Sequence, residues 1–289
     1  MFAIALKADR YPTYVLRDSE LPSRAEVVPE RGGLITRWQI NDQDILYFDA
    51  ERFANPELSV RGGVPILFPI CGNLPDNTYS FNGQTYTLKQ HGFARDLPWQ
   101  TLGQDVTDAA ELTLALDSSE ATRPGYPFEF RLRFTYRLFG HTLEIHQQIT
   151  NLSDQPMPFS TGLHPYFEVK DKAQLSFDLP ASQYLDQNTG EVSAYDGGFD
   201  FSRDEIDVAF KFLSGTRATV TDGDLKRRLT VSWSQAYSTL VFWAIKGKDY
   251  YCLEPWSAPR NALNTGEQLL AVEPQQTFEA TVKFEAEFL

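Results

Sequence analysis

The sequence is poor in the residues that build metal clusters and disulfide frameworks. It contains only two cysteines, Cys71 and Cys252, and four histidines among 289 residues. No CxxC, HExxH or HxH spacing occurs, so the residue pattern gives no reason to expect a bound metal ion. A secreted, disulfide-stapled protein would carry more cysteines. We therefore expect reduced thiols, no metal and a cytoplasmic location.

Positive charge is scarce as well, with 26 lysines and arginines against 39 aspartates and glutamates and a formal net charge of −13. Nucleic acids and anionic membranes both require a basic surface. No run of 18 or more apolar residues occurs, and the first residues, MFAIALKADRYPTYVL, contain Asp9 and no long apolar core of a signal peptide. We expect no nucleic-acid or membrane partner. A small anionic ligand held by two or three arginines stays compatible with this charge, and the oligomeric state stays open.

Motifs for nucleotide binding and for covalent catalysis are also missing. The chain has no P-loop and no GxGxxG, and the glycines of RGGVP (61–65) are followed by a proline instead of the start of a helix. No GxSxG elbow marks a serine nucleophile. We therefore expect no cofactor.

What the sequence does contain is alternation with a period of two. The run 131–139 alternates apolar residues with arginines, and the run 142–151 continues it after Gly140, which predicts a hairpin. The segment 79–88 predicts a second hairpin around Asn82-Gly83. Further short strands are expected at 111–116, 173–179, 228–233, 238–245 and 278–288.

Helical periodicity is nearly absent, and only 49–55 suggests a short helix. We find no internal repeat, low-complexity tract or linker, so residues 1–289 are expected to form one domain. Many short strands separated by turn signals predict an all-β fold, a large antiparallel sandwich or a barrel.

Two histidines and one glutamate are candidates for chemistry. His91 in LKQHGFARDLPW and His164 in STGLHPYFEV lie in loop-like segments, where catalytic groups concentrate on a β scaffold. Glu254 in YYCLEPWSAP ends an apolar strand, where burial would raise its pKa. The plainer interpretations are histidines bonded to the backbone and an ordinary strand-edge glutamate. His141 and His146 are expected at the surface.

Five segments, taken together and in order, resemble the aldose 1-epimerase, or galactose mutarotase-like, family. They are SVRGGVPILFPICGNL (59–74), HGFARDLPW (91–99), GLHPYFEV (162–169), IDVAF (206–210) and CLEPWSAPRNALNTGE (252–267). The resemblance implies a large antiparallel β-sandwich, the galactose mutarotase-like supersandwich, with a sugar site on one concave face. The HGFAR pattern and Trp256 in LEPW are more similar to the hexose-6-phosphate mutarotase and LacX-type branch.

The resemblance also implies roles for seven residues. His164 matches the general acid and Glu254 the general base of a mutarotase, which opens and recloses the sugar ring without a cofactor. We expect them on opposite sides of the ring, with His164 near its ordinary pKa of about 6.5. The implied substrate-binding residues are Arg61, His91, Arg95, Asp207 and Trp256, with Asp200, Asp204 and Glu205 as rivals of Asp207.

The expected function is that of an isomerase, an aldose 1-epimerase that interconverts the α and β anomers of an aldohexose. Its partner is a small sugar or sugar phosphate. One alternative is a hexose-6-phosphate 1-epimerase, in which Arg95 holds the phosphate. If the segment after His91 is extended, His91, Phe93 and Arg95 point to one side. Otherwise Arg95 pairs with Asp96 or Glu57. A second alternative is a non-catalytic carbohydrate-binding or sensor protein on the same fold.

Overall fold

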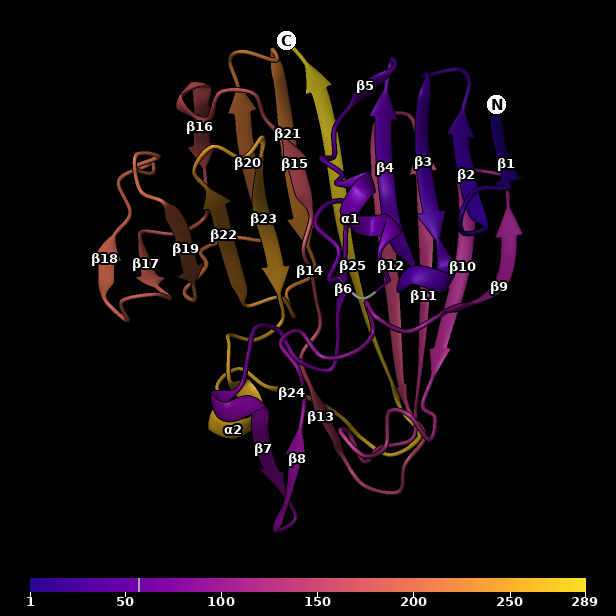
Figure 1. The fold of residues 1–289 in the computed structure, drawn as a ribbon, viewed down its shortest axis with the longest axis vertical. Coiled ribbons are helices and arrows are strands. Elements are labelled where there is room, and N and C mark those ends of the chain that lie inside the picture. Colours follow the sequence, from indigo (N-terminus) through magenta and orange to yellow (C-terminus); the bar gives the residue numbers. More distant parts are fainter. Residues whose placement is uncertain (57) are drawn as a thin grey trace.

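The structure, a computed structural model that describes residues 1–56 and 58–289, consists almost entirely of antiparallel strands (Figure 1). Glu57, considered above as a partner of Arg95, lies outside the described residues. Two large sheets, a five-stranded N-terminal sheet and two small strand pairs make up the described fold. The all-β antiparallel sandwich expected from the sequence is therefore confirmed.

The first large sheet contains the longest strands and follows the order β16-β20-β21-β25-β12-β11-β10-β9. Its long strands alternate buried and solvent-facing residues, so that Phe134 points inward and its neighbour Arg133 outward. The strands are β9 (Gln100–Asp105), β10 (Ala110–Asp117), β11 (Phe130–Phe139), β12 (Thr142–Asn151), β16 (Leu175–Asp178), β20 (Arg217–Asp222), β21 (Arg227–Trp233) and β25 (Thr277–Phe288).

The second large sheet follows the order β18-β17-β19-β22-β23-β14-β6, and β15 also pairs with β23. Its central strands β22 and β23 are buried on both faces, which explains why their sequences show no clean alternation. The strands are β6 (Ile66–Leu67), β14 (Gly162–Leu163), β15 (Tyr166–Glu168), β17 (Gln183–Asp186), β18 (Val192–Ala194), β19 (Glu205–Phe210), β22 (Thr239–Ile245) and β23 (Tyr250–Trp256).

The N-terminal sheet and the small elements complete the fold. The sheet contains β1 (Phe2–Lys7), β2 (Thr13–Asp18), β3 (Ser23–Val28), β4 (Leu34–Ile40) and β5 (Gln43–Asp44). The strand pairs are β7 (Thr78–Phe81) with β8 (Gln84–Thr87) and β13 (Met157–Phe159) with β24 (Leu270–Val272). The helices are α1 (Ala50–Ala54), α2 (Ala262–Thr265) and the 3-10 turns η1 (Pro29–Arg31), η2 (Pro75–Asn77) and η3 (Lys172–Gln174). Figure 1 shows the β7/β8 hairpin beside α2, far from both termini.

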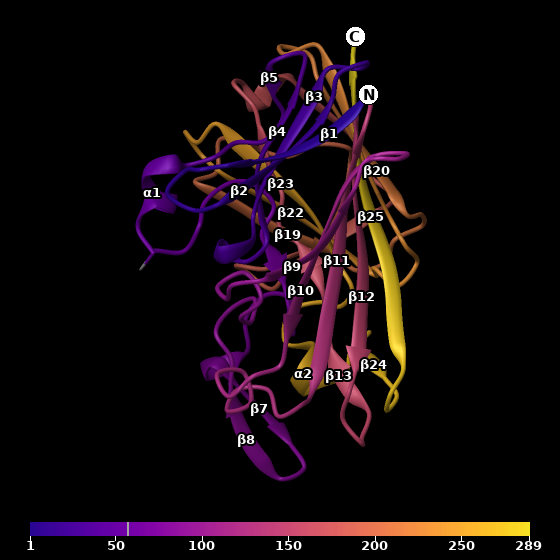
Figure 2. The same ribbon diagram turned by 90° about the vertical axis from the view of Figure 1, so that its right-hand side faces the viewer.

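The two large sheets pack face to face through aromatic side chains. Phe167 of β15 meets Phe284 of β25 with ring centroids 5.9 Å apart, and Phe242 of β22 meets Phe177 of β16 at 5.3 Å. Figure 2 shows the layer of β11, β12 and β25 beside the layer of β22 and β23. Because one face of the second sheet is used for this core, its opposite face is available for a site.

The predicted local elements agree with the structure in most places. The hairpins at 79–88 and 131–151 and the short helix at 49–55 are confirmed. Asp49 caps that helix, since its side chain accepts a hydrogen bond from the Arg52 amide at 2.8 Å. The strand expected at 173–179 begins with the 3-10 turn η3 instead. None of the described helices has the length and apolar character needed to cross a membrane.

Candidate active site

A pocket of about 250 Å³ lies on the outer face of the second sheet. Strands β15, β19, β22 and β23 form its base, and loops around residues 59–61, 90–95 and 260 form its rim. All seven residues singled out in the sequence line it: Arg61, His91, Arg95, His164, Asp207, Glu254 and Trp256. Residues almost 200 positions apart in the chain are thus brought to one ligand-sized space.

Strand register explains why His164 and Glu254 meet. Gly162 of β14 pairs with Trp256, and Tyr166 of β15 pairs with Cys252. His164 lies in the gap between β14 and β15, where Pro165 has no N–H to continue the ladder, and this register places it opposite Glu254. Its Nε2 lies 3.3 Å from Oε1 of Glu254. The expectation that a sugar ring separates the two is therefore wrong, because they are neighbours across two adjacent strands.

The protonation of this pair differs from the sequence-based expectation. Burial, together with the charges of Arg95 and Arg61, lowers the pKa of His164 to about 3. Burial and the neighbouring Asp207 carboxylate raise the pKa of Glu254 well above its usual range. The expected pKa near 6.5 is wrong for the unliganded protein. At neutral pH the imidazole is neutral, and the proton of the pair is favoured on Glu254, whose Oε2 accepts the indole N–H of Trp256 at 3.1 Å.

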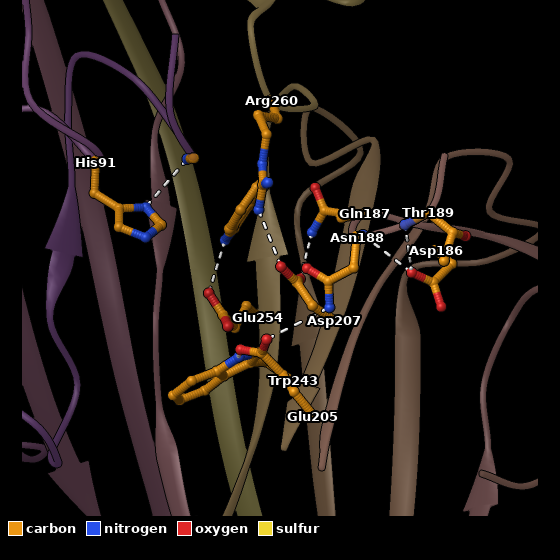
Figure 3. A network of polar contacts seen from close by, with 12 residues as sticks. His91, Asp186, Gln187, Asn188, Thr189, Glu205, Asp207, Trp243, Glu254 and Arg260 are labelled. Carbon is orange, nitrogen blue, oxygen red and sulfur yellow. Dashed lines mark hydrogen bonds and ion pairs between the residues drawn. The ribbon is translucent and has the colours of Figure 1, made fainter. Parts of the chain in front are cut away.

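His91 is fixed by the backbone of Gly72. Its Nδ1 accepts the Gly72 amide at 3.1 Å, and its own amide donates to the Gly72 carbonyl at 2.7 Å (Figure 3). Because Nδ1 acts as an acceptor, the ring proton sits on Nε2. The ring lies edge-on to those of His164 and Trp256, with centroids 5.5 and 5.7 Å away.

The HGFAR segment reaches the pocket by a turn. His91 and Gly92 both have positive φ, 66° and 71°, so the extended conformation considered for this segment is wrong. The turn sends Phe93 into the core, stacked on Phe130 with centroids 5.9 Å apart, while His91 and Arg95 still line the pocket.

Asp207 is the centre of a hydrogen-bonded network on β19. Its Oδ2 accepts from Arg260 at 3.1 Å and its Oδ1 accepts from Gln187 at 2.6 Å (Figure 3). Among its rivals only Glu205 lines the pocket, and its carboxylate is bonded to the indole N–H of Trp243 at 2.8 Å. Asp207 therefore presents a fixed carboxylate to the pocket.

Two arginines face the pocket without an acidic partner among the described residues. The guanidinium carbon of Arg61 lies 5.0 Å from the ring centroid of Trp243, and Arg95 donates to the carbonyl of Gln90 at 3.0 Å. The alternative pair of Arg95 with Asp96 is not among the ion pairs of the described residues: Asp96 acts on Arg95 only as a nearby charge. Guanidinium groups without an acidic partner are suited to bind an anion, because their forked N–H donors match the oxygens of a carboxylate or phosphate.

Trp243 and Arg260 line the pocket but were not recognised from the sequence as site residues. Trp243 was included only in the strand expected at 238–245, and Arg260 was included in the 252–267 segment without a role. Gln187, which donates a hydrogen bond to Asp207, was not marked by any motif. Trp243 and Tyr166 pack on His164, with ring centroids 5.7 and 4.8 Å away. A period-two count along 239–245 would have placed Trp243 on the same face as Val241.

Comparison with known proteins gives a consistent result. Residues 22–285 match the protein-family model described as Aldose 1-epimerase. The chromosomal protein LacX of Lactococcus lactis subsp. lactis is 26% identical over 274 residues, which cover 85% of this chain and 88% of LacX. A protein of Escherichia coli (strain K12) named "Putative glucose-6-phosphate 1-epimerase" is 25% identical over 216 residues, covering 74% of this chain and 68% of that protein.

A solved structure shares the whole fold. The crystal structure of the Slr1438 protein from Synechocystis sp. PCC 6803 superimposes with a TM-score of 0.96 and 51% sequence identity, and 100% of each chain is covered. The arrangement of sheets described above is therefore that of a known protein fold.

Proposed function

Because the chain belongs to the aldose 1-epimerase family, we propose that its pocket binds an aldohexose and interconverts the α and β anomers with His164 and Glu254 as the acid–base pair. The protein is an isomerase of the mutarotase type. The observation that carries the assignment of residues is the 3.3 Å contact between His164 and Glu254 inside the pocket.

The contact fits the chemistry of ring opening. The anomeric hydroxyl and the ring oxygen are both bonded to C1, so a base and an acid that lie side by side can reach them together. The base takes the hydroxyl proton, C1 becomes a carbonyl, and the C1–O5 bond breaks as the acid protonates O5. Rotation about C1–C2 and the reverse proton transfers close the ring on the other face. The pair ends with the proton it started with, and no cofactor is consumed.

A substrate anion helps to set the direction of these transfers. Glu254 acts as the base only when the proton of the pair resides on His164. In the unliganded protein the charges of Arg95 and Arg61 oppose this, since they lower the pKa of His164. A phosphate bound to these arginines offsets their charge and favours the protonated imidazole.

The remaining residues bind the sugar. The fixed carboxylate of Asp207 accepts hydrogen bonds from sugar hydroxyls, and the Nε2–H of His91 donates one. The ring of Trp256, which stands nearly perpendicular to that of His91, offers an apolar surface to the sugar face. Arg61 then contacts the polar end of the sugar, and Arg95 adds a contact when that end carries a phosphate.

A hexose 6-phosphate is the second candidate substrate. It is favoured by the two pocket arginines that have no acidic partner among the described residues. The Escherichia coli relative carries glucose 6-phosphate in its name. The chain as a whole is acidic, with a net charge of −13. Two arginines in one pocket are therefore stronger support for an anionic ligand than they would be in a basic protein.

A non-catalytic carbohydrate-binding protein is less consistent with the pocket. A binding module has no need to bury a carboxyl and an imidazole, since burial of such groups costs free energy, yet the residues Glu254 and His164 are only 1% and 8% exposed. NMR measurement of anomer exchange on glucose, galactose and glucose 6-phosphate, side by side, tests the proposal. We expect acceleration with at least one sugar. Binding of a sugar without faster exchange would favour the binding module.

We also propose that residues 1–289 form one domain in the cytoplasm. One core cluster contains residues of the N-terminal sheet and of both large sheets, which supports a single folding unit. Both cysteines are free and buried, which fits a reducing compartment.

A further inference from the structure

A third side chain that can bind metal lies beside the proposed acid–base pair. Cys252 precedes Glu254 by two residues on β23, so both side chains point to the same face of the strand. One ring nitrogen of His164, the sulfur of Cys252 and a carboxylate oxygen of Glu254 all lie within 4.8 Å of one another. The proposed reaction uses the imidazole and the carboxylate and leaves the thiol without a role.

These three groups form the ligand set of an open zinc site. Thiolate, imidazole and carboxylate are the side chains that bind Zn²⁺, and sites with three protein ligands keep a fourth position for water or another small molecule. With bond lengths of 2.0–2.3 Å, tetrahedral ligands stand about 3.3–3.8 Å apart. The observed spacing therefore requires side-chain shifts of only about 1 Å.

The surroundings of His164 leave it available as a ligand. Its side chain is 10% exposed, its Nε2 faces Oε1 of Glu254 at 3.3 Å, and its Nδ1 is buried without a hydrogen-bond partner among the described residues. His91 is different, because its Nδ1 lone pair is engaged by the Gly72 amide and its Nε2 carries the proton. The cluster thus offers three ligands, and the fourth position faces the pocket, which His164 and Glu254 line.

We propose that His164, Cys252 and Glu254 form an inhibitory site for a thiophilic divalent cation such as Zn²⁺. The cation binds the imidazole lone pair, the carboxylate and the thiolate, and the thiol proton is released to solvent. Arg61 and Arg95 disfavour a cation here, whereas Asp207 and Glu205 favour it. The site is therefore weaker than a structural zinc site and suits an inhibitor instead of a resident cofactor.

Inhibition follows because the cation occupies both groups that move protons. This consequence rests on the proposed function, but metal binding itself does not. The metal site and the proposed function can each be wrong without the other, so metal binding and sugar turnover are measured in separate experiments.

The binding test uses Co²⁺, whose thiolate complexes absorb in the near ultraviolet, on the purified protein. We expect a cobalt–thiolate band in the wild type and in Cys71→Ser, the matched control with the other buried cysteine. The band should be absent in Cys252→Ser and in Cys252→Ala. A band that survives in both Cys252 variants, or no band in the wild type, overturns the proposal. Melting temperatures without metal confirm that each variant is folded.

The turnover test uses buffered free Zn²⁺ on the same proteins. Zinc should inhibit the wild type competitively with the sugar, and a chelator should restore the rate. In Cys252→Ala the zinc-free rate should be unchanged, while the inhibitory concentration should rise on the order of 10-fold or more, because even a second-shell partner costs that much. Equal inhibition of Cys252→Ala and the wild type would overturn the proposal. If no sugar is turned over, the proposed function fails and the cobalt band still decides the site.

Discussion

Glu254 is a carboxyl group with two distinct contacts, the indole of Trp256 and the imidazole of His164. In Glu254→Gln the shape and the bond to Trp256 persist, but no proton can be accepted. We expect kcat to fall by about 10² or more while sugar affinity changes little. Glu205→Gln is the matched control, since Glu205 lines the same pocket but is bonded to Trp243. An unchanged kcat in Glu254→Gln would remove this residue from the mechanism.

His164 and Glu254 titrate as a pair because they are in contact. The active pair holds one proton, so activity should fall both when a second proton is added and when the last is lost. The plot of activity against pH should therefore be bell-shaped, and its two limbs report the apparent pKa values of the pair. His164→Asn should lower kcat and leave only one limb. Stopped-flow polarimetry across pH measures this. A variant that keeps both limbs would contradict the assignment, and His91 would become the candidate.

Arg95 separates the two substrate classes. Charge-assisted hydrogen bonds are worth about 1.5–3 kcal/mol, so Arg95→Ala should slow turnover of glucose 6-phosphate on the order of 10-fold or more and leave free glucose almost unaffected. Arg31→Ala is a suitable control, because Arg31 packs over Tyr11 and Phe53 instead. Equal effects on both sugars, or none, would favour a neutral aldose as the substrate.

The sequence was a good guide to which residues line the pocket, but not to which of them carry a proton. Motifs around His91, His164 and Glu254 pointed to one site, and the structure brings them together. The low pKa of His164 could not be predicted, because it depends on burial and on arginines 69 and 103 residues earlier in the chain. Trp243 escaped notice because a strand buried on both faces looks uniformly apolar.

At the level of elements, the turn at His91-Gly92 depends on a backbone contact. A Cβ on Gly92 would lie 2.2 Å from the carbonyl oxygen of Phe68, and its φ is 71°. Gly83, with φ of 77°, has nothing within 4 Å of such a Cβ. We expect Gly83→Ala to cost about 1 kcal/mol for the left-handed conformation alone, and Gly92→Ala distinctly more. Urea unfolding measures both. Equal losses of unfolding free energy in the two variants would show that the backbone near Phe68 moves aside at no cost, and that the contact does not matter.

Alternation in the sequence was a good guide only where one face of a strand meets solvent. It predicted β11 and β12 as a hairpin because arginines mark the outer face of β11. It could not reveal the break between β14 and β15, whose strands have two and three residues and are fixed by pairing with β6 and β23. It also could not exclude the extended conformation considered for the HGFAR segment, since positive φ at a histidine leaves no mark in a hydrophobic pattern.

For the molecule as a whole, the buried imidazole makes stability depend on pH. The pKa of His164 is about 3 in the folded protein and about 6.5 in an unfolded chain. Between these values the unfolded chain binds more protons, so stability is lost as the pH falls below about 6.5. At pH 5 the loss from this group is on the order of 2 kcal/mol.

His164→Asn removes this titration and should flatten the acid limb of stability. Denaturant unfolding of both proteins at pH 7.5 and pH 5 gives the comparison, with His146→Asn, a half-buried strand histidine, as the control. Parallel losses in the wild type and His164→Asn would mean that His164 is not a neutral buried group.

The pocket divides its groups between two kinds of scaffold. His164 and Glu254 are set by the ladder of β14, β15 and β23, whereas Arg61, Arg95 and Arg260 reach in from loops at the rim. Loops tolerate exchange far better than paired strands. Grafting rim loops between relatives should therefore redirect such an enzyme from one sugar to another, while the proton-transfer machinery is inherited unchanged.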